Sequence, residues 1–283
     1  MNREDGQLFA TTDKAATFAA NRAIGNIALA VKMTHGTTLR ARLREEGALR
    51  VRCPGARAAE LEAVIVTTAG GMAGGDRFAL EFVVEPAARL LVTTAAAEKV
   101  YRTLDPAAAV DVRLTVGDGA SLAWLPQETI LFDRARLRRS IEVDLAEDAR
   151  LVLAEAIVFG RSGMGEAVDD GRLLDRWRVR RNGKLIHAET VRLEGAVAAK
   201  LAESAVAKGA VAVATVLVVP GDDGTTAAVR ALGNTFRGEV GASAWNGFAL
   251  VRLCARDGAA LRHDLVAVLG AIRGRALPRL WLN

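Results

Sequence analysis

The sequence predicts a mainly β protein, built from elongated, antiparallel or solenoid-like stacked β-sheets, with about two α-helices towards the C-terminus. Three observations lead to this fold class. Most of the chain alternates apolar and polar residues, which is typical of strands with one buried face. A short turn followed by Ala and Leu recurs roughly every 30 residues, which indicates stacked units. The last quarter changes to a helical period, with Leu261, Leu265, Leu269 and Ile272 on one face.

Length and composition indicate a packed protein. The 283 residues are 51% hydrophobic, and the mean hydropathy is +0.18, which is too apolar for a disordered chain. No apolar run approaches the ~20 residues of a membrane-spanning helix, and residues 1–5 lack the apolar core of a secretory signal. Cys53 and Cys254 are far apart and lack metal-type spacing. We therefore expect a cytoplasmic protein without disulfides or a membrane anchor.

The charge pattern leaves a nucleic-acid-binding function as an alternative. The net charge is +5, and arginines cluster at 134–139 and at 172–181. These arginines fall largely at every second position, as on the polar face of a strand. The aromatic content of 5% also provides few platforms for base stacking. A structural role for the arginines is therefore favoured over nucleic-acid binding.

The N-terminal part begins with residues 1–26, which we interpret as a partly ordered arm before a single domain of residues 27–283. Residues 39–44 and 49–52 both alternate, and the segment Glu45-Glu46-Gly47 between them has the composition of a turn. Two alternating runs around such a turn predict a β-hairpin.

A glycine-rich segment follows the next strand. A phosphate-binding loop would need a Gly-Lys-Ser/Thr ending or dinucleotide spacing, and it would open a helix, whereas residues 77–84 alternate like a strand. We therefore interpret the glycines as a turn between strands that needs positive φ or close backbone approach. The residues are Gly70, Gly71, Gly74, Gly75 and Asp76.

The repeat occurs at residues 85–90, 117–122 and 146–151, and each copy follows an alternating strand. Stacked β units would explain this spacing, and similar-looking hairpin turns would explain it equally well. In both interpretations we expect an antiparallel body. The elements expected after the repeat are a hairpin of 172–180 and 185–193 around Asn182-Gly183, a short helix within 196–209, a strand at 211–219, a helix near 225–232, strands at 242–245 and 248–254, and a helix near 258–273 with Asp257 as N-cap and Gly274 as its end.

The chain shows no catalytic constellation. His35, His187 and His263 have no metal-ligand spacing, and no nucleophile-elbow motif occurs. The remaining candidates are carboxylates within apolar segments that are predicted to be strands. Burial of a carboxylate costs free energy unless it has a partner. Pairing with arginines such as Arg136 or Arg161 is the favoured explanation, and a hydrolase that uses an acidic pair is an alternative. The carboxylates are Glu128, Asp133, Glu155 and Glu166.

Five motifs, taken together, resemble the urease accessory protein UreD family, called UreH in some organisms. The resemblance covers roughly residues 39–281, and it departs from the family only at Met72-Ala73 and at Ala95. The motifs are 70–76, 93–94 with 98–102, 125–133, 160–166, and the tail segments 242–247 and 277–281. The motif residues to which we assign structural roles are Gly70, Gly71, Gly74, Gly75, Asp76, Lys99, Tyr101, Arg102, Arg161, Gly165 and Trp245.

The resemblance implies a non-enzymatic scaffold in nickel delivery to apo-urease. It implies that UreF and the GTPase UreG are partners, and that nickel is a transient cargo and not a stably bound cofactor. The family resemblance also implies an internal nickel passage, for which Glu128, Asp133 and Glu166 are the candidate wall residues. The lack of a His/Cys cage fits a conduit, because a tight site would trap the ion.

Overall fold

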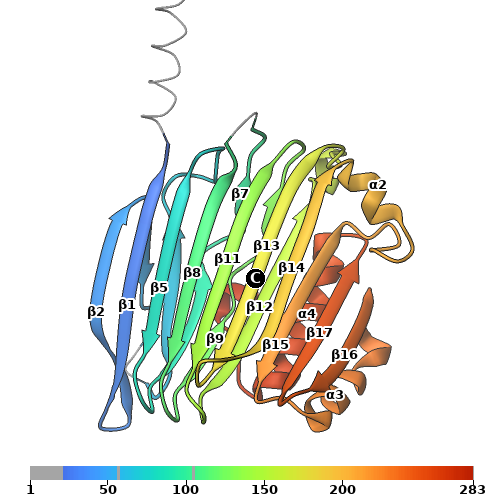
Figure 1. Cartoon of the computed structure of the whole chain (residues 1–283). Helices are drawn as coiled ribbons and strands as arrows, with labels where there is room; N and C mark the ends of the chain where they lie inside the picture. The colour runs from blue at the N-terminus through green and yellow to red at the C-terminus, as the bar shows by residue number, and fades with distance from the viewer. Residues whose placement is uncertain (1–21, 56–57, 104–105, 283) are drawn as a thin grey trace, which may run out of the picture.

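A computed structural model describes residues 22–55, 58–103 and 106–282 and shows two β-sheets stacked face to face (Figure 1). Sheet A contains, in spatial order, β14 (Lys184–Gly195), β13 (Gly171–Arg181), β11 (Arg136–Leu145), β8 (Ala108–Val116), β5 (Arg77–Val84), β1 (Ile24–Thr34) and β2 (Thr37–Gly47). Sheet B contains β16 (Glu239–Trp245), β17 (Phe248–Ala255), β15 (Ala212–Val219), β12 (Arg150–Phe159), β9 (Ser121–Trp124), β6 (Arg89–Thr94), β4 (Leu61–Thr67) and β3 (Leu49–Arg52). Two short strands of sheet B, β7 (Glu98–Val100) and β10 (Thr129–Leu131), pair with each other, and β10 also pairs with β12.

The middle of the chain winds between the two sheets like a solenoid. Each repeated turn carries the chain from a strand of sheet A to a strand of sheet B, so that β5, β8 and β11 alternate with β6, β9 and β12. The turns stack on one another, since the N–H of Ala87 donates to Asp118 and the N–H of Arg150 donates to Ala120. The Ala that recurs in each turn is fully buried, which explains why it recurs: Ala88, Ala120 and Ala149. The stacked-unit interpretation of the repeat is therefore confirmed.

The expectation of an antiparallel body is wrong for these repeats. β5, β8 and β11 pair in parallel, as do β6, β9 and β12. Each turn carries the chain to the other sheet, and one unit later the chain returns to the first sheet and runs in the same direction as before. Neighbouring strands within one sheet are therefore parallel. Antiparallel pairing is found towards the two ends of the sheets, among others between β1 and β2, between β13 and β14, and from β12 through β15 and β17 to β16.

The predicted hairpin of 39–44 and 49–52 is also wrong. β2 runs on to Gly47 and pairs with β1, whereas β3 belongs to sheet B and pairs with β4. Gly47 has a φ of 61°, and a Cβ there would lie 1.7 Å from the Ile24 carbonyl oxygen. This glycine therefore turns the chain from one sheet to the other.

The boundary of the N-terminal arm differs from the expectation. Residues 1–21 of the expected arm lie outside the described residues, and 24–26 already belong to β1. The Asn-Gly hairpins of β13–β14 and β16–β17 are confirmed, and both cysteines are free.

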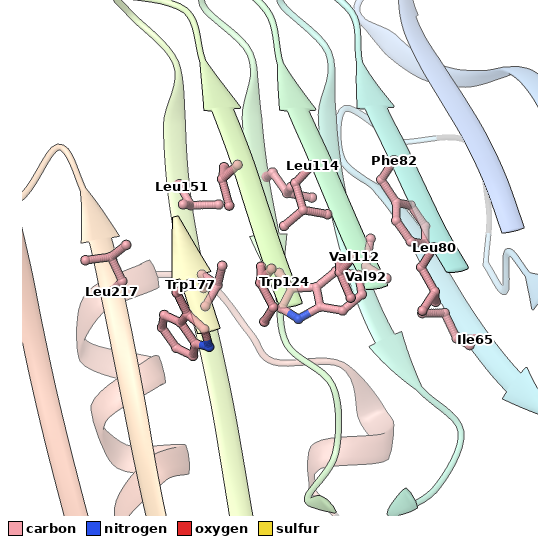
Figure 2. Close-up of a cluster of buried hydrophobic side chains, with 14 of the residues drawn as sticks. Ile65, Leu80, Phe82, Val92, Val112, Leu114, Trp124, Leu151, Trp177 and Leu217 are labelled. Carbon is pink, nitrogen blue, oxygen red and sulfur yellow. The ribbon is translucent and has the colours of Figure 1, made fainter. Parts of the chain in front are cut away.

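Large apolar side chains fill the space between the sheets (Figure 2). Phe82 and Leu114 reach in from sheet A and Trp124 from sheet B, and the Phe82 and Trp124 rings meet edge to face with centroids 5.5 Å apart. Burial of one such side chain contributes about 1.5–3 kcal/mol. The inward residues of both sheets thus form one continuous core.

The helices α3 (Asp223–Arg230) and α4 (Gly258–Arg273) cover the outer face of sheet B (Figure 1). Both predicted helices are confirmed, and α4 starts at Asp257, whose carboxylate accepts a hydrogen bond from the Ala260 N–H, and ends at a left-handed Gly274. The remaining helical elements are α2 (Val197–Ala202), η1 (Ser162–Met164), η2 (Gly233–Thr235) and η3 (Arg279–Trp281). Among the described residues, no helix has both the length and the apolar character needed to cross a membrane.

Candidate functional site: a motif cluster and an internal charge cluster

Motifs that are far apart in the sequence meet at one end of the two sheets. The Met72 N–H donates to the Lys99 carbonyl, the Phe132 N–H to the Val100 carbonyl, and the Gly160 N–H to the Leu131 carbonyl. These bonds join the glycine turn, the 98–102 motif, β10 and the end of β12 into one ladder. We call this group of residues 70–76, 98–102, 129–133 and 160–166 the motif cluster.

The glycines of the motif cluster make room for their neighbours. A Cβ on Gly71 would lie 2.7 Å from the Tyr101 ring, and a Cβ on Gly74 would lie 1.8 Å from the Thr103 hydroxyl oxygen. The Tyr101 hydroxyl donates to the Gly70 carbonyl over 2.8 Å. Asp76 is buried and accepts hydrogen bonds from the N–H groups of Ala23 and Ala73. A structural role fits these residues.

Asp133 and Glu166 come together at the surface of the motif cluster. The Arg161 guanidinium lies 4.2 Å from the centre of the Phe132 ring and donates to Glu166 over 2.7 Å. Asp133 accepts a hydrogen bond from the Asp170 N–H, and its own N–H donates to Glu166. The hydrogen bond from Arg161 lowers the pKa of Glu166 below its usual value. A carboxyl with a lowered pKa is ionised at neutral pH and is a poor general acid.

Glu128 lies elsewhere. Its carboxylate accepts a hydrogen bond from Arg262 of α4 over 2.8 Å, and Arg262 also donates to Gln127 and to the Leu280 carbonyl. The guanidinium of Arg262 stacks on Trp281 at 5.2 Å. Glu128 therefore ties α4 and the C-terminal segment to sheet B.

The expectation that Glu128, Asp133 and Glu166 all face one interior is therefore wrong. Gln127 and Thr129 line an internal cavity, whereas Glu128 between them is turned to α4. Residues 125–128 lie between two strands, so the alternation of strand faces does not extend through them. The role of the three carboxylates in nickel transfer stays a prediction.

The other motif residues are spread more widely. Lys99 and Arg102 are exposed at the motif cluster, and Gly165 has a left-handed φ of 67°. Trp245 lies outside the cluster, at the turn between β16 and β17, where its ring packs on Phe248 with centroids 4.5 Å apart.

Two cavities lie between the sheets. The inner cavity, about 70 Å³, is lined by the polar side chains of Thr67, Thr94, Glu98, Gln127 and Thr129, in addition to Arg139 and Glu155. The edge cavity, about 480 Å³, lies between β13 and β14 of sheet A and β15 to β17 of sheet B. Arg139 and Glu155 line both cavities, so these two side chains stand between them.

A buried charge cluster forms at this junction from Arg139, Glu155 and Asp175, each 5% exposed. Arg139 donates to Asp175 over 2.5 and 3.1 Å, and it forms a close ion pair with Glu155. The Trp124 indole N–H donates to Glu155 over 2.8 Å, and the Trp177 indole N–H donates to Asp175 over 3.2 Å. Every member therefore has partners, as buried charges require.

The cluster holds one cation and two carboxylates, so it carries a surplus negative charge when all three are ionised. Burial alone would lower the pKa of Arg139, but the two carboxylates outweigh burial and hold it above its usual value. Burial raises the pKa of Glu155, and the nearby Asp175 raises it further. A proton or a metal cation that enters either cavity can neutralise this surplus.

The sequence contained a signal for this cluster. Arg139 lies between Leu137 and Ile141 on the inward face of β11, and Asp175 lies between Leu173 and Trp177 on β13. A charged residue at an inward position of an alternating strand indicates a buried ion pair. Glu155 was a candidate from the sequence, whereas Arg139 and Asp175 were missed because they belong to arginine-rich runs.

Glu98 at the inner cavity provides a pH-dependent prediction. Burial raises its pKa, and the hydrogen bond from the Thr67 hydroxyl only partly offsets that rise. A carboxyl with a raised folded-state pKa destabilises the fold increasingly as pH rises from its ordinary pKa through its folded-state pKa. Glu98→Gln is therefore expected to raise the unfolding free energy at pH 7, and the gain should vanish below pH ~4. Urea unfolding across this pH range checks the prediction, and a gain that does not depend on pH would contradict it.

The outer face of sheet A accounts for many of the clustered arginines. Arg138 pairs with Asp111 over 3.0 Å, Arg180 with Glu142 over 2.9 Å and Arg172 with Glu194 over 3.5 Å. These pairs offset part of the positive charge of the face and so reduce its attraction for nucleic acid.

The fold and the site define a two-sheet β protein with a buried charge cluster between two cavities. Within the described part of the chain, no group of three or more His, Cys, Asp or Glu side chains could hold a metal ion. The sequence profile of the family described as UreD urease accessory protein matches residues 23–282. The chain belongs to the UreD urease accessory protein family.

The chain is similar in sequence to named relatives over nearly its whole length. The chain is 55% identical over 267 residues to a urease accessory protein UreD of Rhodopseudomonas palustris (strain ATCC BAA-98 / CGA009), which covers 94% of this chain and 96% of the relative. It is 56% identical over 266 residues to a protein of the same name from Bradyrhizobium diazoefficiens, with coverage of 94% and 96%. These relatives support a role in urease maturation.

Proposed function

We propose that this chain is a non-catalytic scaffold that delivers nickel to apo-urease in the cytoplasm, together with UreF and the GTPase UreG. Membership of the UreD family supports the urease role. The observation that carries the nickel part is the charge cluster of Arg139, Glu155 and Asp175, because its surplus negative charge lies where two internal cavities meet. The ion would pass between the sheets through the edge cavity and the inner cavity.

The chemistry of this interior suits an ion that must be released. Its polar walls offer carboxylate and hydroxyl oxygens, such as those of Glu98, Thr67 and Thr129, and two carboxylates of the charge cluster. Nickel binds tightly to imidazole and thiolate sets, whereas scattered oxygens hold it weakly. Arg139 offsets one of the two cluster carboxylates and so prevents a deep electrostatic trap. The interior thus attracts the cation without a tight site.

Asp133, Glu166 and Glu128 would act at the boundary of this route. Asp133 and Glu166 lie on the motif cluster, whose strands β7 and β10 contribute Glu98 and Thr129 to the inner cavity. In this proposal their carboxylates would receive or release the cation at that end. Glu128 acts through Arg262, because it fixes α4 against the segment that holds Gln127 and Thr129.

Single alanine substitutions test these three carboxylates. Glu128→Ala, Asp133→Ala and Glu166→Ala are each expected to leave the chain folded and to lower urease activation in a cell-based assay. Glu81→Ala is the control, because Glu81 is exposed on the outer face of sheet A. Full urease activation by all three variants would show that nickel delivery does not need these carboxylates.

Co-purification with apo-urease, UreF and UreG tests the scaffold role directly. The chain is expected to form a complex with them, and the complex is expected to raise the nickel content of urease. The alternatives predict different behaviour, since a hydrolase would show turnover by the purified chain alone. A nucleic-acid-binding protein would show affinity that falls steeply with salt. Absence of a complex with every one of the three proteins would overturn the proposal.

A further inference from the structure

Sheet A leaves one broad face open. Helices α3 and α4 cover the outer face of sheet B, whereas the outer face of sheet A is open in the described part of the chain (Figure 1). Arginines dominate the outward positions of its neighbouring strands β11, β13 and β14, and we call this surface the arginine face. Its charged residues are Arg136, Arg138, Arg172, Arg176, Arg178, Arg180 and Arg192, with the carboxylates Glu142, Asp144 and Glu194.

The positive excess is confined to these three strands. The outward charges of the next two strands balance, since β8 carries Arg113 with Asp111 and β5 carries Arg77 with Glu81. Further carboxylates belong to the turns before β12 and β13, beyond the ends of the strands. They reduce the charge at the two ends of the arginine face, so the excess is greatest at its centre. These turn residues are Glu147, Asp148, Asp169 and Asp170.

The outward arginines of β13 exceed the carboxylates beside them. Glu142 accepts a hydrogen bond from Arg180 over 2.9 Å and lies 4.0 Å from Arg176. Arg178, between these two arginines on β13, donates to two backbone carbonyls, which are neutral partners. β13 thus presents three successive outward cations against Glu142 and Asp144 of β11.

A carboxylate of β14 is also shared by two arginines. Glu194 accepts a hydrogen bond from Arg192 over 2.7 Å and lies 3.5 Å from Arg172. The side chains of Arg176 and Arg192 are 50% and 67% exposed. Exposed ion pairs contribute at most about 1 kcal/mol, so these two arginines can turn to a new anion at little cost. Glu142 and Glu194 would then keep Arg180 and Arg172 as partners.

The composition of the arginine face indicates what binds there. A second copy of this chain would present the same positive excess and would be repelled. Single-stranded nucleic acid stacks on aromatic rings, and the outward positions of these three strands hold none. A lipid surface needs apolar anchors, whereas Leu174 is half-buried between Arg138 and Arg192 in the register of the sheet. A protein surface rich in carboxylates fits best, because guanidinium groups bind carboxylates through paired hydrogen bonds.

We propose that the arginine face docks an acidic surface of a partner protein, whose carboxylates pair with Arg176 and Arg192. The excess charge would also steer the partner to the face and so speed association. The inference rests on the proposed function for its probes, which are purified apo-urease, UreF and UreG.

Association of each probe is measured by surface plasmon resonance with the wild type, Arg176→Glu, Arg192→Glu and the double variant. For one probe, the double variant is expected to associate about tenfold more slowly at about 50 mM salt, and each single variant to show part of this loss. The loss should shrink at about 300 mM salt, because salt screens exposed charges. Both variants are expected to fold, since Glu142 and Glu194 each keep an arginine.

Arg42→Glu is the matched control. Arg42 is exposed on β2, which is five strands from β13 in the order of sheet A. At about 4.8 Å per strand this separation exceeds the Debye length of about 10 Å at 0.1 M salt. The control is therefore expected to change the association rate less than about twofold at that ionic strength.

Three results would overturn the proposal. One is equal association of the double variant and the wild type with every probe, and another is no binding of any probe. The third is tighter binding of a single-stranded oligonucleotide or of phosphatidylserine vesicles than of any probe, with loss in the double variant. A urease activation assay separates this inference from the proposed function: a wild type that does not activate urease overturns the function, whereas an active wild type with unchanged binding by the double variant overturns the arginine face alone.

Discussion

Arg139→Met is expected to lower the unfolding free energy by about 3–5 kcal/mol at pH 7, because it leaves Glu155 and Asp175 buried without their cation. Methionine fills similar space, so the loss reports the charge more than the packing. The two indole N–H donors of Trp124 and Trp177 stay in place but cannot neutralise two carboxylates.

The pH dependence of this loss follows from Glu155. Burial already raises the pKa of Glu155, and loss of Arg139 removes the cation that opposes this rise, so the destabilisation is greatest at neutral pH and falls as pH drops through the folded-state pKa of Glu155. Arg138→Met is the matched control on the same strand, because Arg138 forms an exposed pair with Asp111 that contributes at most about 1 kcal/mol. Urea unfolding of both variants measures the difference. If Arg139→Met lowers the unfolding free energy no more than Arg138→Met does, the buried charge cluster does not stabilise the fold as described.

Thr215→Trp is expected to have the second large effect, which is on urease activation, because the new side chain fills the edge cavity next to the charge cluster. Thr215 lies on β15, pairs with Glu155 of β12 and lines the edge cavity. The new indole enters space that is already open, so the chain is expected to fold with less than about 1.5 kcal/mol of change in stability. If nickel passes between the sheets, urease activation is expected to fall roughly tenfold or more, which corresponds to about 1.4 kcal/mol on the rate-limiting barrier.

Thr115→Trp is the matched control for this substitution. Thr115 is an exposed residue of β8 on the outer face of sheet A, so the same residue change there adds no bulk between the sheets. Both variants are compared by thermal unfolding before the activation assay. A difference between them then reports the position of the indole and not its chemistry.

Local sequence signals predicted the elements that depend on local physics. Helix α4 follows from its apolar period and from the caps at Asp257 and Gly274, and the hairpin of β13 and β14 follows from Asn182-Gly183. The recurring turns left stacked units and similar hairpin turns equally open, and the structure shows stacked units in which each recurring Ala is fully buried.

The direction in which distant strands pair could not be predicted from local sequence signals. Alternation of apolar and polar residues is the same in parallel and antiparallel strands, so it could not show that β5, β8 and β11 are parallel. Glu45–Gly47, predicted as a turn, belong to β2, and the chain changes sheets after Gly47, where Gly47 closely approaches Ile24.

The candidate site was predicted in part. The sequence placed Asp133 and Glu166 in motifs that the fold brings together, but the orientation of Glu128 depends on Arg262, more than a hundred residues away. Apolar and polar residues alternate along β11 and along β13. Within each strand this alternation places Arg139 and Asp175 on the inward face.

The most direct test of the nickel route is the nickel content of urease matured with the Thr215→Trp chain. Apo-urease is incubated with UreF, UreG, GTP, nickel and either Thr215→Trp, Thr115→Trp or wild type, and nickel per urease is measured by mass spectrometry after the proteins are separated. The route between the sheets predicts that Thr215→Trp assembles with its partners but leaves urease largely free of nickel, whereas Thr115→Trp loads it like the wild type. Equal nickel content with both variants would contradict a passage through the edge cavity.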